Sequence, residues 1–494
     1  MSVLTALARL HAVRTGRAEP IADVRHIHLS DNPLVLVPLK MAGEAAAPLA
    51  IMVGSDPAAP TLLPVPQPRD RVLRLRFLAE LAEIVLPHLA VYAENTEELT
   101  TKSGETYERC LDAPQLWVPN SGGVGFLKLL GRSTRFHRTE GDNAVPESVP
   151  LLGRWLTWFC DRAEHPGSST LVPLTSALSA HWATGQSALE DANLAALLGW
   201  IAPPPGSTGP EAAARAEDPL SVPPAGPATD PGFDNEELAP LIAAYDAAED
   251  DGSKSLAARR IERALHAQIE PTWQLMWQGL ALLRELEAGA RVARRWNEDV
   301  GSFSYFAGSV PEGVPQARRD SAVSAVRKLL DWERALEKYE AEKAFDDPRI
   351  MLEHRLAGTA FVGTVIDVDS TRVVMSEKNR SLLRPILQVR TADPIVAAEG
   401  DEFCNVGNPT QTGKVLPVEG DRDHIVLELS GGMGTGKVAR PGSVPELGAT
   451  VCFAGFKIGS GGPPAKLPAR EDTPWTHGGP PPEWTPDSEP IEEL

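Results

Sequence analysis

The chain has 494 residues, of which 42% are hydrophobic, and a formal net charge of −20. This length exceeds what one hydrophobic core supports, so we expect several domains. The charge excludes a chain that is basic throughout, but the acidic residues are concentrated. Residues 201–255 contain eleven acidic and two basic residues, and residues 471–494 contain seven acidic residues and no lysine or arginine. A nucleic-acid-binding surface on one of the neutral domains is therefore compatible with the composition.

Cysteine and arginine usage indicates the source of the chain and its compartment. The 35 arginines against 12 lysines favour a bacterial source with a GC-rich genome. The four cysteines form no CxxC pair, so neither a zinc site nor a disulfide framework is expected. No apolar run approaches the roughly 20 residues that span a bilayer. We therefore expect a cytoplasmic protein without a membrane segment, metal or cofactor.

The first 201 residues predict one α+β domain. Short apolar runs between Asp, Gly and Pro residues predict a small meander of strands over residues 24–55, beginning with VRHIHLS. The apolar spacing then becomes helical over residues 70–93. Further helices are expected at 152–165, 171–184 and 189–201.

Residues 202–235 are rich in Pro, Gly, Ala and acidic residues, and this composition predicts a flexible, disordered linker. Residues 236–357 predict a helical domain, in which Pro271 suits the first turn of a new helix. Within it, an apolar stripe over residues 316–345 predicts a long stalk helix of coiled-coil character. Asp347 and Pro348 are a predicted N-cap and N1 pair for the next helix.

After Gly358 the hydrophobic period changes to two. Short apolar strands alternate with Asp, Gly, Pro and Asn, which predicts a small closed β-barrel over residues 358–468. Residues 469–494 are Pro-rich and acidic and predict a disordered tail. The complete prediction is a multidomain α+β protein: α+β domain, linker, helical domain with stalk, β-barrel and tail.

The stretch GGMGTGK at residues 431–437 resembles a nucleotide-binding phosphate loop without meeting its requirements. Such a loop needs Ser or Thr after the lysine to hold magnesium, and a helix that begins at the loop. Here Val438 follows Lys437, and Pro441 and Pro445 prevent a helix. We interpret the stretch as a glycine-rich connection between two barrel strands, and no catalytic residue is assigned.

The predicted stalk and barrel include ERALEKYEAEKAFDD, MLEHRLAGTAFVGTVIDVDSTRVVMS after it, and later GKVLPVEGDRDHIVLELSGG. This part of the sequence resembles the stalk-and-barrel accessory insert of Upf1-like superfamily 1 helicases. The resemblance covers residues 316–468, and the RecA-like motor motifs are absent from the chain. In that family the barrel contacts single strands or regulates the adjacent motor. The resemblance therefore implies a detached accessory component that works with an ATPase on another chain.

Basic side chains on the barrel are candidates for contacts with phosphate groups. They are Arg384, Arg390, Lys414, Lys437, Arg440 and Lys457. Four phenylalanines of the barrel could stack bases if they face outward, although alternate strand positions more often form the core.

A second candidate is an anion site in the N-terminal domain. The stretch NSGGVGFLK places Gly122, Gly123 and Gly125 before a predicted helix, where backbone amides can approach an anion. The stretch GRSTRFHR follows and supplies Arg132, Arg135 and Arg138. A tight turn beside a basic surface is the alternative interpretation.

Three functions remain open from the sequence. The first is a non-catalytic, nucleic-acid-associated accessory component that acts with a separate helicase-type ATPase or a nuclease, with single-stranded nucleic acid as a partner. The second is an enzyme with a phosphate site in the N-terminal domain. The third is a protein-interaction scaffold, for which the repeated Trp-Thr pairs at Trp475 and Trp484 could supply a docking peptide for a basic groove.

Overall fold

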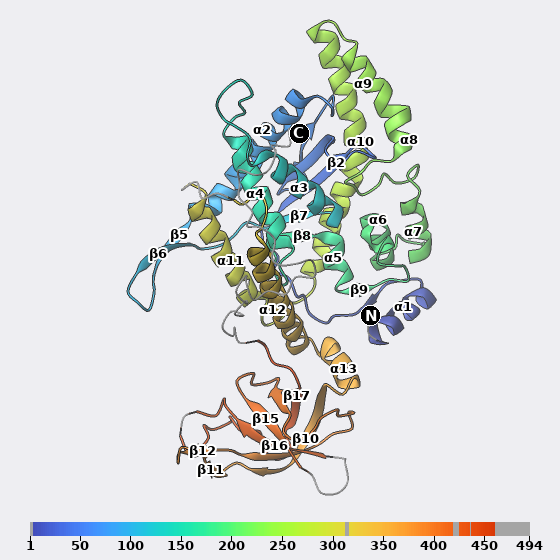
Figure 1. Ribbon diagram of the computed structural model, residues 1–494. Coiled ribbons are helices and arrows are strands. Elements are labelled where there is room, and N and C mark those ends of the chain that lie inside the picture. The colour runs from blue at the N-terminus through green and yellow to red at the C-terminus, as the bar shows by residue number, and fades with distance from the viewer. Residues whose placement is uncertain (1–2, 312–315, 418–423, 435, 460–494) are drawn as a thin grey trace, which may run out of the picture.

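The computed structural model describes residues 3–311, 316–417, 424–434 and 436–459. It is a mixed α+β structure with an N-terminal α/β body, a long helix and a C-terminal barrel (Figure 1). The helices are α1 (Val3–Thr15), α2 (Arg71–Ala93), α3 (Ser121–Thr134), α4 (Ser148–Ala163), α5 (Leu174–Ser179), α6 (Leu194–Ile201), α7 (Gly209–Glu217), α8 (Pro231–Phe233), α9 (Ala239–Asp246), α10 (Asp251–Arg284), α11 (Val292–Ser309), α12 (Ala322–Asp346) and α13 (Pro348–Leu356).

The body is built on a five-stranded sheet in the order β4-β3-β2-β7-β8. Its strands are β2 (Leu34–Lys40), β3 (Pro48–Gly54), β4 (Thr61–Pro64), β7 (Leu116–Val118) and β8 (Leu171–Pro173). β2 pairs in parallel with β7, as β7 does with β8, whereas β2, β3 and β4 form an antiparallel meander. The predicted meander is therefore present, but VRHIHLS forms only an isolated bridge from Arg25 to Ala288.

Helices cover both faces of this sheet, because its strands are apolar on both sides. On β2, Val35 and Val37 belong to one core, with α5, α6 and α10. Leu34 and Leu36 face the other core, with α2, α3, α4 and α11. The region expected at 171–184 as one helix instead contributes strand β8, the short helix α5 and strand β9 (Trp182–Ala183), which pairs with β1 (Glu19–Pro20).

The segment expected to be a flexible linker is packed onto the body. Helix α7 begins with a capping box formed by Thr208 and Glu211, and Ala213 and Ala216 are buried against α6. Phe233 at the end of the segment is also in the core. Small alanine side chains allow this close approach, so a composition typical of linkers forms an ordered edge of the body here.

The first long helix of the expected helical domain shares a hydrophobic core with the N-terminal sheet. Helix α10 runs unbroken for 34 residues, with Pro271 inside it rather than at the start of a new helix. Its buried face includes Ile269 and Trp273 on either side of the proline, and both lie in the core that covers β2 and β3. Continuous packing against the sheet thus offsets the lost backbone hydrogen bond.

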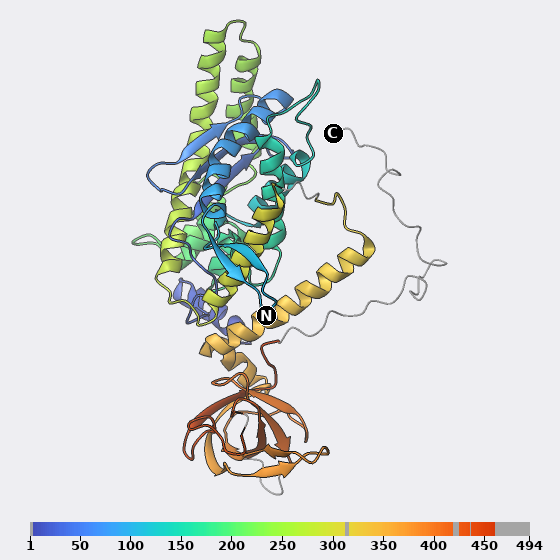
Figure 2. The ribbon, with the colours of Figure 1, turned by 90° about the vertical axis from the view of Figure 1, so that its left-hand side faces the viewer.

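The stalk helix and the capping pair are present. α12 extends over 25 residues from the body toward the barrel, and Asp347 caps α13 by accepting the Arg349 backbone amide at 2.9 Å (Figure 2). Three apolar side chains on α12, Val326, Leu329 and Leu336, are 42–55% exposed. The helix is therefore a rod that packs closely only at its C-terminal end.

The barrel is closed and antiparallel, as predicted, in the order β10-β13-β16-β15-β14-β17. These strands are β10 (Ala360–Asp369), β13 (Ile386–Arg390), β14 (Glu402–Asn405), β15 (Thr412–Leu416), β16 (His424–Ser430) and β17 (Thr450–Ala454). Two small ribbons, β11 (Val373–Met375) with β12 (Ser381–Leu383) and β5 (Thr96–Thr100) with β6 (Thr106–Cys110), project from the barrel and the body, respectively. The final acidic residues lie outside the described part of the chain.

Candidate functional sites

The two halves of the predicted anion site lie at opposite ends of α3. The glycines occupy the first turn, and Arg132 and Arg135 lie at its end. A helix of this length is roughly 20 Å long. The structure therefore does not bring Gly122, Gly123 and Gly125 together with Arg132, Arg135 and Arg138.

The glycine end is already filled by the chain itself. Asn120 caps the helix by accepting the Gly123 amide at 3.1 Å and donates from its side chain to the Gly226 carbonyl at 2.9 Å. A Cβ atom on Gly122 would lie 2.8 Å from Pro227. Gly122 therefore serves the close packing of Pro227 on α3, whereas Gly123 packs against Val118.

The arginine end forms a different site. Phe136 is 41% exposed, and guanidinium groups lie near its ring, with Arg135 at 4.7 Å and Arg318 at 5.0 Å from the centroid. Arg135 is buried and donates to the Ala317 carbonyl at 2.9 Å, which joins the end of α3 to the segment before α12. Cation–π contacts of this kind hold both guanidinium groups at one aromatic ring.

Two further arginines lie near these side chains, and Arg138 follows two residues after Phe136 in the sequence. Burial lowers the pKa of Arg135, and the nearby charges of Arg132 and Arg318 lower it further, partly opposed by Asp161 and Asp320. Burial also lowers the pKa of His137, and the charge of Arg71 adds to this effect. We call Arg71, Arg132, Arg135, Phe136, Arg138 and Arg318 the Arg–Phe cluster.

The arginines of this cluster are not neutralised by direct pairing. Among the residues that the structure describes, no ion pair involves Arg71, Arg132 or Arg138, and all three side chains are exposed. Exposed arginines that repel one another gain from a ligand that carries several negative charges. The Arg–Phe cluster can therefore bind phosphate groups.

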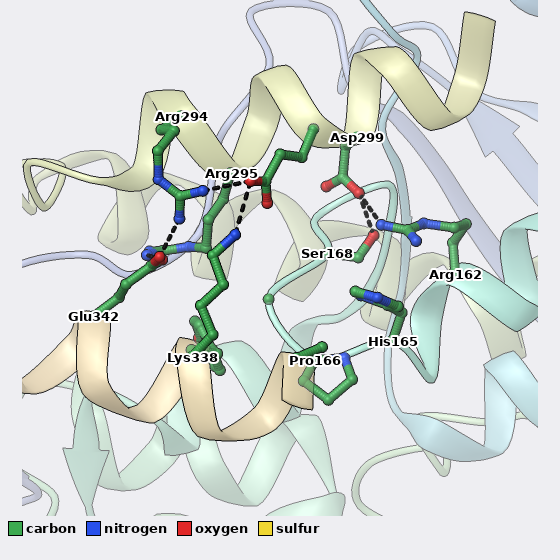
Figure 3. Close-up of a pocket in the computed structure, with 13 residues that line it drawn as sticks. Arg162, His165, Pro166, Ser168, Arg294, Arg295, Asp299, Lys338 and Glu342 are labelled. Atoms are coloured by element: carbon green, nitrogen blue, oxygen red, sulfur yellow. Dashed lines mark hydrogen bonds and ion pairs between the residues drawn. The ribbon is translucent and has the colours of Figure 1, made fainter. Parts of the chain in front are cut away.

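A second site is a cavity of about 230 Å³ where α11, α12 and the loop after α4 meet (Figure 3). Asp299 is 1% exposed and accepts hydrogen bonds from Arg162, from the Ser168 hydroxyl at 2.8 Å and from the Ser169 amide at 2.7 Å. Opposite them, Glu342 is fully buried. We call these side chains, together with Arg294 and Arg295, the junction network.

The cations of the junction network are paired with carboxylates. Arg295 donates to Glu342 at 2.8 Å, and Arg294 binds both Glu342 and Glu298. Lys338 on α12 also binds Glu298, at 2.8 Å. Burial lowers the pKa of His165 at the rim, which keeps this ring neutral near pH 7. The network thus joins the rod to the body and leaves little charge for a ligand.

The six basic residues predicted on the barrel do not form one groove. Lys414 on β15 lies between Glu402 on β14 and Glu428 on β16. Arg384 donates to the adjacent Leu383 carbonyl at 2.9 Å. The others lie at separate places: Arg390 ends β13, Lys437 and Arg440 lie in the connection from β16 to β17, and Lys457 follows β17.

Three of the four barrel phenylalanines face inward. Phe361 lies 5.5 Å from Phe403 and 5.9 Å from Phe453, measured between ring centroids, and all three are buried. The fourth, Phe456, packs against Phe345 of the rod. These rings form the barrel core and its attachment to the rod, so they cannot stack bases.

The GGMGTGK stretch connects β16 to β17, as predicted. Gly431, Gly432 and Gly434 have φ values of +72°, +66° and +96°, which only glycine adopts readily. No described residue between β16 and β17 is helical. The described amides therefore lack the helix dipole that a nucleotide-binding loop uses.

Searches of the described residues and of known proteins add no assignment. No group of three or more His, Cys, Asp or Glu side chains in the described residues could hold a metal ion. None of the helices in that part of the chain has the length and apolarity needed to cross a bilayer. No protein-family model, curated protein or solved structure matches the chain.

Three of the five arginines in the Arg–Phe cluster could be predicted from the sequence, whereas Arg71 and Arg318 could not. The motif GRSTRFHR signals a local basic segment with an aromatic residue. Arg71 and Arg318 lie far from it in sequence, and only the packing of α2 and of the segment before α12 brings them near. No local pattern could have indicated them.

Proposed function

We propose that the chain is a non-catalytic accessory component that binds single-stranded nucleic acid and acts with a separate helicase-type ATPase or a nuclease. The proposal depends on the Arg–Phe cluster, in which Arg135 and Arg318 contact a partly exposed ring. The exposed Arg71, Arg132 and Arg138 of this cluster have no ion pair among the described residues. Phosphate groups satisfy such arginines, and exposed aromatic rings stack bases without sequence preference.

The architecture supports the accessory role. A rod of 25 residues leads to a closed barrel outside the body. The resemblance to the stalk-and-barrel insert suggests that the barrel regulates a partner, because the rod holds the barrel away from the body. In this proposal the body binds the single-stranded nucleic acid, while the rod and barrel contact the partner ATPase or nuclease.

The experiment is fluorescence anisotropy with a 30-nucleotide oligothymidine at 50 and 200 mM NaCl. Each phosphate contact to a single strand contributes about 0.7 to the salt slope, so the four exposed arginines of the cluster give a slope of roughly −2.8 and a loss of affinity of about 50-fold. Replacing Arg132 and Arg138 with alanine should reduce the slope by about 1.4.

Two control variants locate the site. Arg259 and Arg263 are exposed on α10, so the double alanine variant removes the same charge elsewhere on the body. It should leave the slope unchanged. Replacing Lys437 and Arg440 with alanine tests the barrel. A larger loss in this variant than in the Arg132 and Arg138 variant would contradict binding by the body, and no binding by the intact chain would reject the proposal.

A protein-interaction scaffold is the second candidate, and the exposed side chains of Val326, Leu329 and Leu336 on the rod favour it. Its test is co-purification from the native cells after nuclease treatment. A partner that is retained by the intact chain and lost when Leu329 and Leu336 become serine would support the scaffold. The enzyme alternative has weaker support, because α3 separates the glycines from the arginines.

A further inference from the structure

We infer that the acidic segment 471–494 of the same chain docks on the Arg–Phe cluster and competes there with nucleic acid. The inference rests on the proposed function for its consequence, but the contact itself requires only the cluster. The segment lies outside the described residues. Its composition, and the position at which the described chain stops, indicate where it binds.

The acidic segment and the Arg–Phe cluster have opposite charges. Residues 471–494 contain seven carboxylates, two tryptophans and no lysine or arginine. The Arg–Phe cluster offers exposed Arg71, Arg132 and Arg138, which have no ion pair among the described residues. By contrast, the arginines of the junction network already bind Asp299, Glu298 and Glu342. The cluster is therefore the better match for a segment of this charge.

Aromatic contacts add to this match. The Phe136 ring is 41% exposed between arginine side chains. Trp475 and Trp484 in the acidic segment can cover an exposed ring or lie over a guanidinium group. An acidic segment with tryptophans thus resembles single-stranded nucleic acid in its chemistry, because both combine negative charges with flat aromatic groups.

The chain after Gly459 is long enough to reach the Arg–Phe cluster. The described chain stops at Gly459, three residues after Phe456, whose ring lies 5.9 Å from that of Phe345 near the C-terminal end of α12. The Arg–Phe cluster lies at the opposite end of α12, beyond Ser321. The two points are separated by about 36 Å of helix. Twelve residues from Gly459 to Glu471 can span about 40 Å, and sixteen residues to Trp475 about 55 Å.

A tethered segment of moderate affinity is enough for regulation. A linker of this length gives an effective concentration on the order of 1 mM. If the free segment binds with a Kd of about 100 µM, the tethered segment occupies the cluster roughly 90% of the time. The apparent affinity for a single strand then falls about tenfold, because only the uncovered fraction binds it.

The first experiment measures the contact without nucleic acid. A fluorescein-labelled peptide of residues 471–494 is titrated with a full-length variant in which the seven carboxylates of that segment are replaced by amides. We expect binding, and we expect loss of binding when Arg132→Ala and Arg138→Ala are added. Arg259→Ala with Arg263→Ala should retain binding. Equal binding to the two arginine variants, or no binding at all, would overturn the inference.

The second experiment measures competition and separates the inference from the proposed function. The amide variant should bind oligothymidine about tenfold more tightly than the natural chain, and the peptide should displace the strand from it. If no form binds oligothymidine while the peptide binds through the arginines, the proposed function fails and the docking stands. Light scattering tests whether the docked segment comes from the same chain or from a second copy. If the natural chain is a dimer and the amide variant is a monomer, a second copy supplies the segment, and docking within one chain is overturned.

Discussion

Two groups of arginines in this protein have the same chemistry but different surroundings. In the junction network, Arg162 and Arg295 bind the buried carboxylates Asp299 and Glu342. In the Arg–Phe cluster, Arg132 and Arg138 are exposed and have no ion pair among the described residues. The role of an arginine therefore depends on whether a carboxylate lies within reach of it. The first group holds the rod on the body, and the second is free to bind an external anion.

The largest expected effect is at Glu342. Replacing it with alanine leaves the buried side chain of Arg295 without its partner, and losses of this kind cost about 3–5 kcal/mol of unfolding free energy. Urea denaturation measures this loss. Glu298→Ala is the matched control, because Glu298 binds Arg294 and Lys338 but is 53% exposed, and it should cost at most about 1 kcal/mol. Equal losses of unfolding free energy in the two variants would contradict the expectation that the buried ion pair contributes more to stability than the exposed one.

Acid should lower the stability of the body without changing the charge of the arginines in the Arg–Phe cluster. Burial lowers the pKa of His181 to about 4, below its ordinary value of 6.5. Between pH 6.5 and 4, His181 is therefore protonated in the unfolded chain but mostly neutral in the folded chain. The free energy of unfolding is highest above pH 6.5 and decreases as the pH falls toward 4. This histidine alone should remove roughly 2 kcal/mol between pH 7.5 and 5.

The measurement is the unfolding free energy across this pH range. The His181→Gln variant lacks the titrating group and should show a smaller change. His11→Gln is the control, since the His11 side chain is 60% exposed. If the pH dependence of the His181 variant equals that of the natural chain, the buried ring is not the source. Oligothymidine affinity, corrected for the folded fraction, should not fall over the same range, because arginine stays charged.

A further effect on stability connects α4 to the Arg–Phe cluster. A Cβ atom on Gly153 would lie 2.5 Å from the backbone nitrogen of Arg135, so Gly153→Ala should cost about 1–3 kcal/mol and displace Arg135. Oligothymidine affinity should fall with it. Gly125→Ala on α3 is the control, because its Cβ meets nothing within 4 Å and alanine favours a helix. A stable Gly153 variant with unchanged affinity would show that the position of Arg135 does not matter for binding.

Much of the fold could be predicted from local patterns. The period-two strands after Gly358 predict the barrel, and the Asp347 and Pro348 pair predicts the start of α13; the structure contains both. Local reasoning failed where distant packing decided the outcome. Pro271 continues α10 because the helix face on both sides of it is buried, and α7 is ordered because its alanines fit against α6.

The candidate site divides in the same way. The sequence by itself determined that GRSTRFHR is basic and aromatic, because the charge of arginine does not depend on its surroundings. Only the tertiary structure decided that Gly122 is covered by Pro227, that Lys414 lies between two glutamates, and that Arg318 reaches the ring of Phe136. The physical reason is that helix periods and caps are set by residues a few positions apart. Charge pairing and burial are instead set by contacts between segments far apart in the sequence, as between Arg135 and Ala317 or between Asp23 and Arg349.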